Sequence, residues 1–172
     1  RIGRDISEAL QFTPEVTVNN TIVLQQQAPI LELATVSQKF KHEYTWTNSW
    51  LGSTKKIYIE GVFETKAGYD LNKKFSINIR DDEAIVTLPY PQVLSVEQTG
   101  EVTFADEHGV WNWISNDNRS KAITAFQADA RKYAQQASFV ADADKHMRET
   151  LEKILQKHGK KLVVKYSGQR PK

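Results

Sequence analysis

A single long apolar stripe dominates the last third of the chain. From Arg119 to His158, apolar side chains recur at intervals of three and four residues, the spacing of one face of an α-helix. A continuous helix over this range would be roughly 60 Å long. A compact domain of this size has a diameter of only about 40 Å. The helix must therefore break or protrude, and we expect a break near Ser138 with the second piece folding back.

Residues at both ends of the stripe support a helical region over residues 117–158. Residues 116–118 are Asn-Asp-Asn, whose side chains can accept hydrogen bonds from the first free N–H groups of a helix. Gly159 follows the stripe, and glycine commonly ends a helix. Residues 161–167 are rich in β-branched and aromatic residues, so we expect a final short strand at a sheet edge.

The first two thirds of the chain alternate between apolar and polar residues, as half-buried strands do. The alternation is clearest over residues 31–46 and 55–65, with turn residues between them, so we expect a hairpin. Shorter runs predict further strands up to residue 104. Turns between these strands are predicted at residues 66–70, 81–83 and 99–100. The whole pattern predicts an α+β fold, in which an antiparallel β-meander over residues 31–104 precedes the helical region and the last strand.

The composition predicts one folded domain. The chain has 172 residues, of which 40% are hydrophobic and 26% charged, as in ordinary globular proteins. We place the single α+β domain at residues 29–168, with a tail at residues 169–172. Residues 1–28 form a polar lead, which is either partly disordered or a short helix, because Pro14 ends any helix begun before it.

Composition and motifs exclude several function classes. The net charge of +2 provides no general attraction for nucleic acid, so we expect no nucleic-acid partner. The absence of cysteine excludes disulfides, thiol catalysis and cysteine metal sites. No phosphate-binding glycine loop, nucleophile elbow or zinc-binding histidine pair is found. We therefore assign no catalytic residues, and we expect no cofactor and no enzyme activity.

Two groups of ionisable residues could still carry chemistry. In the cluster of Asp142, Asp144 and His146, the first and last residues lie one helical turn apart and could bind a divalent metal, yet a solvated helix face is the favoured explanation of the same residues. Asp81, Asp82 and Glu83 could supply the carboxylates of a hydrolase, yet aspartate favours turns for its local hydrogen bonds. We therefore expect no metal site and keep a hydrolase as the least favoured alternative.

Two sets of residues are candidate contact surfaces. Trp111 and Trp113 lie in phase in a loop-like stretch, and with Tyr90, between two prolines, they form a candidate binding surface. The second set lies on the helical stripe, where a partner helix could pack. Its residues are Val140, Met147, Leu151 and Ile154. Asp144 is polar in the middle of this stripe, which fits either a helix break or a coiled-coil partner.

Two segments of the sequence are unusual together. The first is A-G-Y-D-L at residues 67–71, and the second is L-P-Y-P-Q-V-L-S-V at residues 88–96. On these motifs the chain resembles the domain of unknown function 4230 family of uncharacterised bacterial proteins, over most of residues 30–165. The resemblance implies one N-terminal membrane helix ahead of the domain and no known catalytic residue. A sheet followed by an Ala-rich helix is also similar to band-7, stomatin-like domains.

The chain starts at Arg1 without a methionine, so we expect an upstream segment, with about 20 apolar residues as a membrane anchor. We predict a non-enzymatic, membrane-anchored domain on the extracytoplasmic side, in the periplasm or at the cell exterior. It acts through a protein partner or as a homo-oligomer. The alternatives are an envelope ligand-binding module that uses exposed Trp and Tyr loops, and a hydrolase with turn carboxylates.

Overall fold

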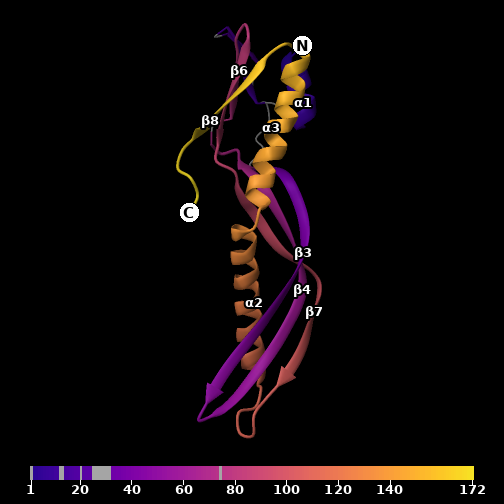
Figure 1. Cartoon of the computed structure of the whole chain (residues 1–172), viewed down its shortest axis with the longest axis vertical. Coiled ribbons are helices and arrows are strands. Elements are labelled where there is room, and N and C mark those ends of the chain that lie inside the picture. Colours follow the sequence, from indigo (N-terminus) through magenta and orange to yellow (C-terminus); the bar gives the residue numbers. More distant parts are fainter. Residues whose placement is uncertain (1, 12–13, 20, 25–31, 74) are drawn as a thin grey trace. The chain divides into compact units, whose positions relative to one another are not determined.

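The computed structural model describes residues 2–11, 14–19, 21–24, 32–73 and 75–172, which form helices α1 to α3 and strands β1 to β8 (Figure 1). In chain order the elements are α1 (Ile2–Leu10), β1 (Glu15–Val18), β2 (Thr21–Leu24), β3 (Glu32–Trp50), β4 (Ser53–Asp70), β5 (Ser76–Ile79), β6 (Glu83–Pro89), β7 (Gln92–Glu107), α2 (Asn116–Gln136), α3 (Phe139–Lys157) and β8 (Lys161–Ser167). The predicted α+β class is confirmed.

The chain folds into two compact units, each with its own hydrophobic core. Unit 1 contains Arg1–Val36, Ala67–Leu94 and Val140–Lys172. Unit 2 contains Ser37–Lys66 and Ser95–Phe139. The boundary falls within β3, β4 and β7 and at the start of α3. Each unit is therefore assembled from segments that are distant in sequence.

Unit 1 contains a mixed five-stranded sheet in the order β2-β1-β5-β6-β8. The β1–β5 and β6–β8 pairs are parallel, whereas β1–β2 and β5–β6 are antiparallel. Strand β8 covers the residues predicted for the final strand and lies at the sheet edge, as expected. The turn predicted at residues 81–83 is also correct, since it joins β5 to the antiparallel β6, with Ile77 paired with Val86.

The core of unit 1 follows from alternation in the strands and from the apolar stripe of α3. Strands β5 and β6 bury every second side chain, including Ile77 and Val86. Helix α3 contributes buried apolar side chains to the same cluster, among them Leu151 and Leu155. The lead contains helix α1, whose residue Ile6 is fully buried in this core. Residues 12–13, 20 and 25–31 lie outside the described residues.

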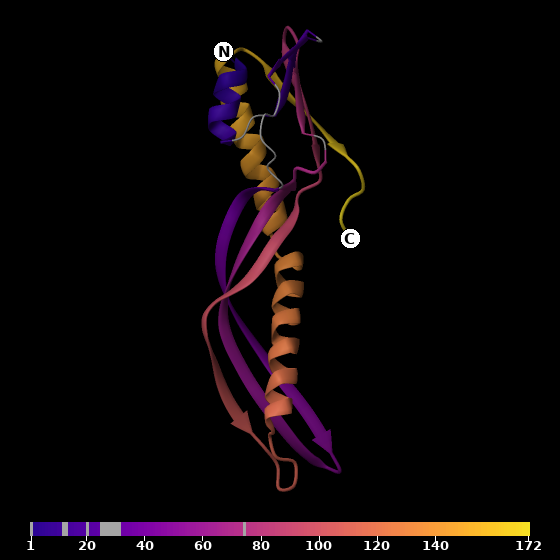
Figure 2. The same ribbon diagram turned by 180° about the vertical axis from the view of Figure 1, so that it is seen from behind.

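Unit 2 contains an antiparallel three-stranded sheet in the order β3-β4-β7, with α2 against one face (Figures 1 and 2). Alternate residues of β4 point to the helix, and Ile57 and Phe63 share a buried cluster with Phe126 of α2. Gly61 lies between them in β4, and a Cβ atom there would lie 3.1 Å from the Phe126 ring. The small residue therefore allows the helix to pack closely on the sheet.

Two of the predicted turns are absent, because the strands are longer than their alternation suggested. Strand β4 continues to Asp70, through the turn predicted at residues 66–70. Strand β7 continues through residues 99–100 to Glu107. Gly100 has φ +75°, a conformation that glycine adopts without strain, so the chain passes this point and stays in the strand.

The predicted helix break near Ser138 is confirmed, whereas the expected folding back of the second piece stays a prediction, because the two helices belong to different units. Helix α2 ends at Gln136 and α3 begins at Phe139. Gly159 follows α3 with φ +67°, the left-handed conformation expected after a helix. The N-cap of α2 is Ser115, one residue earlier than the predicted cap residues, and Asn118 completes a capping box with it.

Candidate functional site: an uncharged aromatic tip

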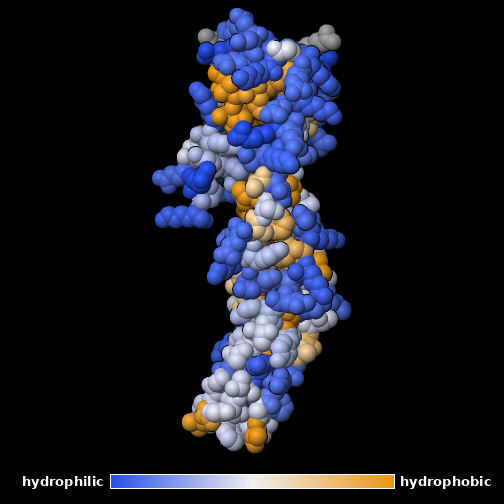
Figure 3. Space-filling view, viewed as in Figure 1, coloured by the Kyte–Doolittle hydropathy of each residue, from blue (hydrophilic) through white to orange (hydrophobic). Residues whose placement is uncertain are grey.

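Large apolar side chains are exposed on two loops of unit 2. The exposed fractions are 56% for Trp50, 73% for Leu51, 80% for Val110, 49% for Trp111 and 66% for Trp113. The first two residues lie at the β3–β4 turn and the other three in the loop between β7 and α2. Figures 1 and 2 show both loops at the same end of unit 2, and Figure 3 shows hydrophobic side chains there. We call these five residues the aromatic tip.

The β3–β4 turn forces one tip residue into an unfavourable backbone conformation. Its two central residues are Leu51 with φ +46° and Gly52 with φ +78°. Hairpin turns with two positive φ angles favour Asn-Gly, because a bulky side chain in the left-handed region costs about 1–2 kcal/mol. Leu51 is also mostly exposed, so packing within the chain does not offset this cost. Strain at an exposed apolar residue points to a role in contact.

Hydrogen bonds join the second loop to the turn. The indole Nε1 of Trp111 donates to the backbone oxygen of Trp50 at 3.3 Å. The side-chain amide of Asn112, which is only 6% exposed, donates to the backbone oxygens of Asn48 at 3.3 Å and Ser53 at 3.1 Å. A buried amide that connects two loops fixes their relative positions, because each bond would be costly to leave unmade.

Close packing and a buried lysine hold the base of the tip. A Cβ atom at Gly109 would lie 2.0 Å from the Ser53 hydroxyl, so the loop approaches β4 more closely than any other residue would permit. The ammonium group of Lys55 donates to the backbone oxygen of Trp113 at 3.1 Å and to the Asn118 side chain at 2.8 Å. The loop is thereby tied to the N-terminus of α2.

The aromatic tip carries no charge. Residues 47–54 and 109–116 include no Asp, Glu, Lys, Arg or His. Four exposed charged residues near the second loop form ion pairs, since Arg119 bonds Asp106 and Lys121 lies 3.0 Å from Asp117. Burial of the tip against a partner would therefore desolvate aromatic, aliphatic, hydroxyl and amide groups, and no ion.

The structure separates the residues of the predicted binding surface. Trp111 and Trp113 belong to the aromatic tip in unit 2. Tyr90 belongs to unit 1, where its half-buried ring stacks on Tyr166 with centroids 4.8 Å apart. The guanidinium of Arg170 lies 5.5 Å from the centroid of the Tyr90 ring. Tyr90 therefore contacts Tyr166 and Arg170 of its own unit.

The helix stripe that was predicted as an interface is used within unit 1. Met147, Leu151 and Ile154 are buried in its core, and Val140 is half-buried. The stripe packs against the sheet of the same unit, so a partner helix has no access to these three side chains in the folded chain. The apolar periodicity predicted the helix correctly, but the apolar face that it marks packs in the core of unit 1.

Asp144 is the centre of a polar network that the sequence did not reveal. Its carboxylate accepts hydrogen bonds from Tyr69 at 3.0 Å, from Tyr166 at 2.6 Å and from Nε of Arg148 at 3.0 Å. Burial and the adjacent Asp144 carboxylate raise the pKa of Tyr69. Burial and its bond to Asp144 likewise raise the pKa of Tyr166. Asp144 therefore joins β4, α3 and β8, which explains a polar residue in the stripe.

The turn at residues 81–83 is held through its backbone. Asp81 and Asp82 are exposed, and the backbone oxygens of Arg80 and Asp81 accept hydrogen bonds from the ammonium group of Lys160.

Within the described ranges, no group of three or more His, Cys, Asp or Glu side chains is placed to hold a metal ion. No helix among the same residues is long and apolar enough to span a membrane.

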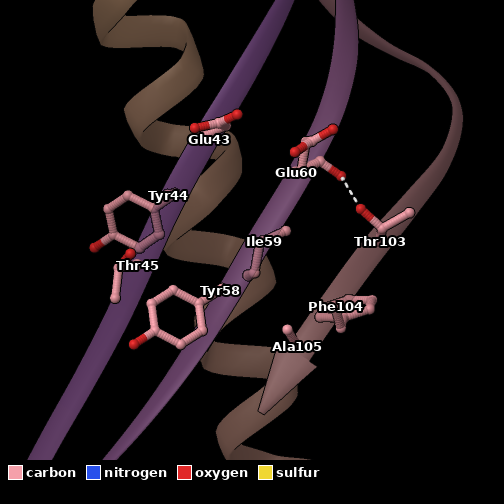
Figure 4. Close-up of a pocket in the computed structure, with 9 residues that line it drawn as sticks. All are labelled: Glu43, Tyr44, Thr45, Tyr58, Ile59, Glu60, Thr103, Phe104 and Ala105. Atoms are coloured by element: carbon pink, nitrogen blue, oxygen red, sulfur yellow. Dashed lines mark hydrogen bonds between the residues drawn. The ribbon is translucent and has the colours of Figure 1, made fainter. Parts of the chain in front are cut away.

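A shallow groove crosses the three strands of unit 2 (Figure 4). It is lined by Glu43, Tyr44 and Thr45 of β3, by Tyr58, Ile59 and Glu60 of β4, and by Thr103, Phe104 and Ala105 of β7. Its polar groups are bonded within the sheet: Lys41 lies 2.8 Å from Glu60, and the hydroxyl of Tyr58 donates to Glu107 at 2.9 Å. Several polar groups at the groove are therefore already engaged within the sheet.

Comparison with known proteins identifies a family but no described activity. No curated protein and no solved structure matches the chain. The model of the family described as "Protein of unknown function (DUF4230)" matches residues 25–166, which is most of the chain and close to the range expected from the motifs. The chain therefore belongs to the DUF4230 family.

Proposed function

We propose that this chain is a non-enzymatic, membrane-anchored domain on the extracytoplasmic side, and that it acts by docking its aromatic tip on an apolar partner surface. The observation that carries the proposal is the exposure of five large apolar side chains on two uncharged loops. The loops are held by a buried amide and by close backbone packing. A rigid contact surface loses little conformational entropy on binding, which favours affinity.

Two further observations support docking over catalysis. Among the ionisable residues of α3, Asp144 is occupied by a structural network with Tyr69, Arg148 and Tyr166. Exposed aromatic residues are the commonest anchors of binding surfaces. Self-association along the α3 stripe is not part of the proposal, because that stripe is buried in unit 1.

The anchoring part of the proposal rests on the family resemblance, which implies one N-terminal membrane helix ahead of the domain. Its test is fractionation of cells that produce the full-length native protein, followed by protease treatment of intact cells and spheroplasts. We expect the domain in the membrane fraction and cleaved from outside. A protein that remains soluble, or is membrane-bound but protected, contradicts this location.

The docking part is tested by site-specific photocrosslinking in cells. A benzophenone amino acid replaces Trp113 in the tip, and in a control it replaces the exposed Lys132 of α2. We expect an adduct, to protein or to lipid, at position 113 and none at position 132. The adduct should disappear when Leu51 is also changed to Asn. Equal labelling at the two positions, or none at position 113, would reject the tip as a contact surface.

A further inference from the structure

We infer that the partner of the aromatic tip is the interfacial region of a lipid bilayer, into which Trp50, Leu51 and Trp113 insert. This inference rests on the proposed function and names the partner. It depends on three properties of the tip, which are its charge, its hydrogen bonding and its exposure.

The absence of charge favours lipid over a protein surface. Protein interfaces usually surround an apolar centre with a polar rim that gives specificity. Residues 47–54 and 109–116 provide no ion for such a rim. An ionised side chain is costly to insert into a bilayer, whereas tryptophan is enriched at the membrane interface. The tip thus contains the residue types that a bilayer accepts and lacks those that it rejects.

Two polar side chains of the tip loops, those of Trp111 and Asn112, are already bonded within the chain. The indole N–H of Trp111 donates to Trp50, and the amide of Asn112 donates to backbone oxygens of both neighbouring segments. Polar groups without partners oppose transfer into an apolar phase. Their internal bonds therefore lower the free-energy cost of moving the tip from water into lipid.

The exposed fractions describe a protruding surface. Trp113, Leu51 and Val110 each leave about two thirds or more of their area in water. Protruding apolar residues suit a fluid partner, which needs no preformed pocket. Burial of one large apolar side chain is typically worth about tenfold or more in affinity. Several such residues on adjacent loops are enough for reversible membrane binding without any electrostatic attraction.

The charges near the tip predict that its binding to a bilayer depends only weakly on salt concentration. Arg119 is paired with Asp106 and Lys121 with Asp117. The ammonium group of Lys55 is buried and donates within the chain, so the base of the tip has little exposed net charge to offer anionic lipids. The C-terminal segment is different, because Lys160, Lys161 and other basic residues follow the last acidic residue, Glu152. Binding through that segment would require anionic lipid and would fall steeply with salt. Salt concentration and lipid charge therefore distinguish binding through the tip from binding through the C-terminal segment.

The test is binding of the full chain to vesicles of phosphatidylcholine alone, measured by flotation and by quenching of tryptophan fluorescence with acyl-chain-brominated lipid. We expect binding that changes little between low and high salt. Leu51→Asn should weaken it about tenfold. Asparagine accepts the left-handed conformation better than leucine, so this variant keeps the fold. Trp113→Ser should weaken binding similarly and reduce the quenching.

The matched control is Phe104→Ser, because Phe104 is an exposed aromatic residue of unit 2 outside the tip. It should leave vesicle binding unchanged. Binding that requires anionic lipid, or that both tip variants retain, overturns the inference. If the wild type fails to bind vesicles while residue 113 crosslinks to a protein in cells, the docking proposal stands and the lipid partner is wrong. If both measurements fail, both proposals are wrong.

Discussion

At the scale of single residues, Gly109 occupies a position where no side chain fits. A Cβ atom would lie 2.0 Å from the Ser53 hydroxyl and 3.2 Å from the Thr54 nitrogen. We expect Gly109→Ala to lower the free energy of unfolding by about 1–3 kcal/mol, as overpacked substitutions do. Urea unfolding followed by circular dichroism measures this change.

Ser53 supplies the matched variant for this prediction. Its buried hydroxyl has no hydrogen-bond partner among the residues that the structure describes. Ser53→Ala should therefore be neutral or stabilising by up to about 1 kcal/mol, and it should recover part of the loss in the Gly109→Ala background. Additive effects of the two substitutions would show that the close approach is not the cause.

The Asp144 network predicts a stability that depends on alkaline pH. The pKa of Tyr69 is raised in the folded chain by burial and by Asp144, so the folded state retains its phenolic proton at pH values where the unfolded chain loses it. The stabilisation is complete below about pH 10, the pKa of an unperturbed tyrosine, and is lost as the pH rises above it. Tyr69→Phe should cost about 1.5–3 kcal/mol at neutral pH and should reduce the loss above about pH 10.

Urea unfolding of both proteins between about pH 8 and pH 11 tests this expectation, because the interval includes the unperturbed tyrosine pKa. The substitution Tyr133→Phe, at an exposed tyrosine of α2, is the control for general alkaline effects. A pH profile of Tyr69→Phe that runs parallel to the wild-type profile contradicts the assigned role of Tyr69.

Sequence alone identified two of the five residues of the aromatic tip as a candidate surface. Trp111 and Trp113 stood out because they share a phase in a stretch without strand or helix signals. Trp50 and Leu51 were placed in a turn, but their exposure depends on the loop that lies beside them, which Asn112 fixes from a distant part of the chain. Local patterns contain no information about that pairing.

At the scale of elements, the start of α2 depends on Asn118. Its side chain accepts from the Ser115 N–H at 2.9 Å, and it also accepts from Lys55 at 2.8 Å. Asn118→Ala should therefore cost about 1–2 kcal/mol, more than Ser115→Ala, which removes the cap bond alone. Asp117→Ala removes only an exposed ion pair and should change stability by less than about 0.5 kcal/mol.

Thermal or urea unfolding of the three variants ranks these contributions. Equal losses for Asn118→Ala and Ser115→Ala would show that the bond from Lys55 adds nothing to the capping box.

The elements were predicted unevenly, and for physical reasons. The helix break, the final strand and the β5–β6 hairpin follow from local signals, namely helix length, glycine at a cap and alternation on both sides of a turn. The parallel pairs β1–β5 and β6–β8 bring together segments that are distant in sequence. Alternation shows that a strand has a buried face but not which strand lies beside it, so these neighbours could not be predicted.

At the scale of the whole molecule, two separate cores predict two local responses to core substitutions. Leu151 packs in the cluster of unit 1 and Phe126 in that of unit 2. Leu151→Ala should cost about 2–5 kcal/mol and Phe126→Ala about 3–5 kcal/mol. Hydrogen exchange should lose protection mainly in β5, β6 and α3 for the first variant, and in β4 and α2 for the second.

The substitution Leu151→Asp tests the earlier prediction that the apolar stripe of α3 is an interface for a partner helix. The variant should unfold unit 1 at any protein concentration, because the charge replaces a buried side chain. If the variant stays folded and only loses an oligomeric state, the result would support the predicted helix interface. Mass measurement combined with circular dichroism distinguishes the two outcomes.

The position of β8 in the sheet of unit 1 has a consequence for the chain's biosynthesis. All the residues of unit 2 have been translated when Phe139 is added, whereas β6 must wait for Lys161–Ser167. A ribosome adds about 5–20 residues per second, so β6 remains without its last neighbour for seconds while the nascent chain emerges. A chain released before Lys161 would keep that edge permanently open, and an unpaired apolar strand is a template on which other unfinished chains aggregate.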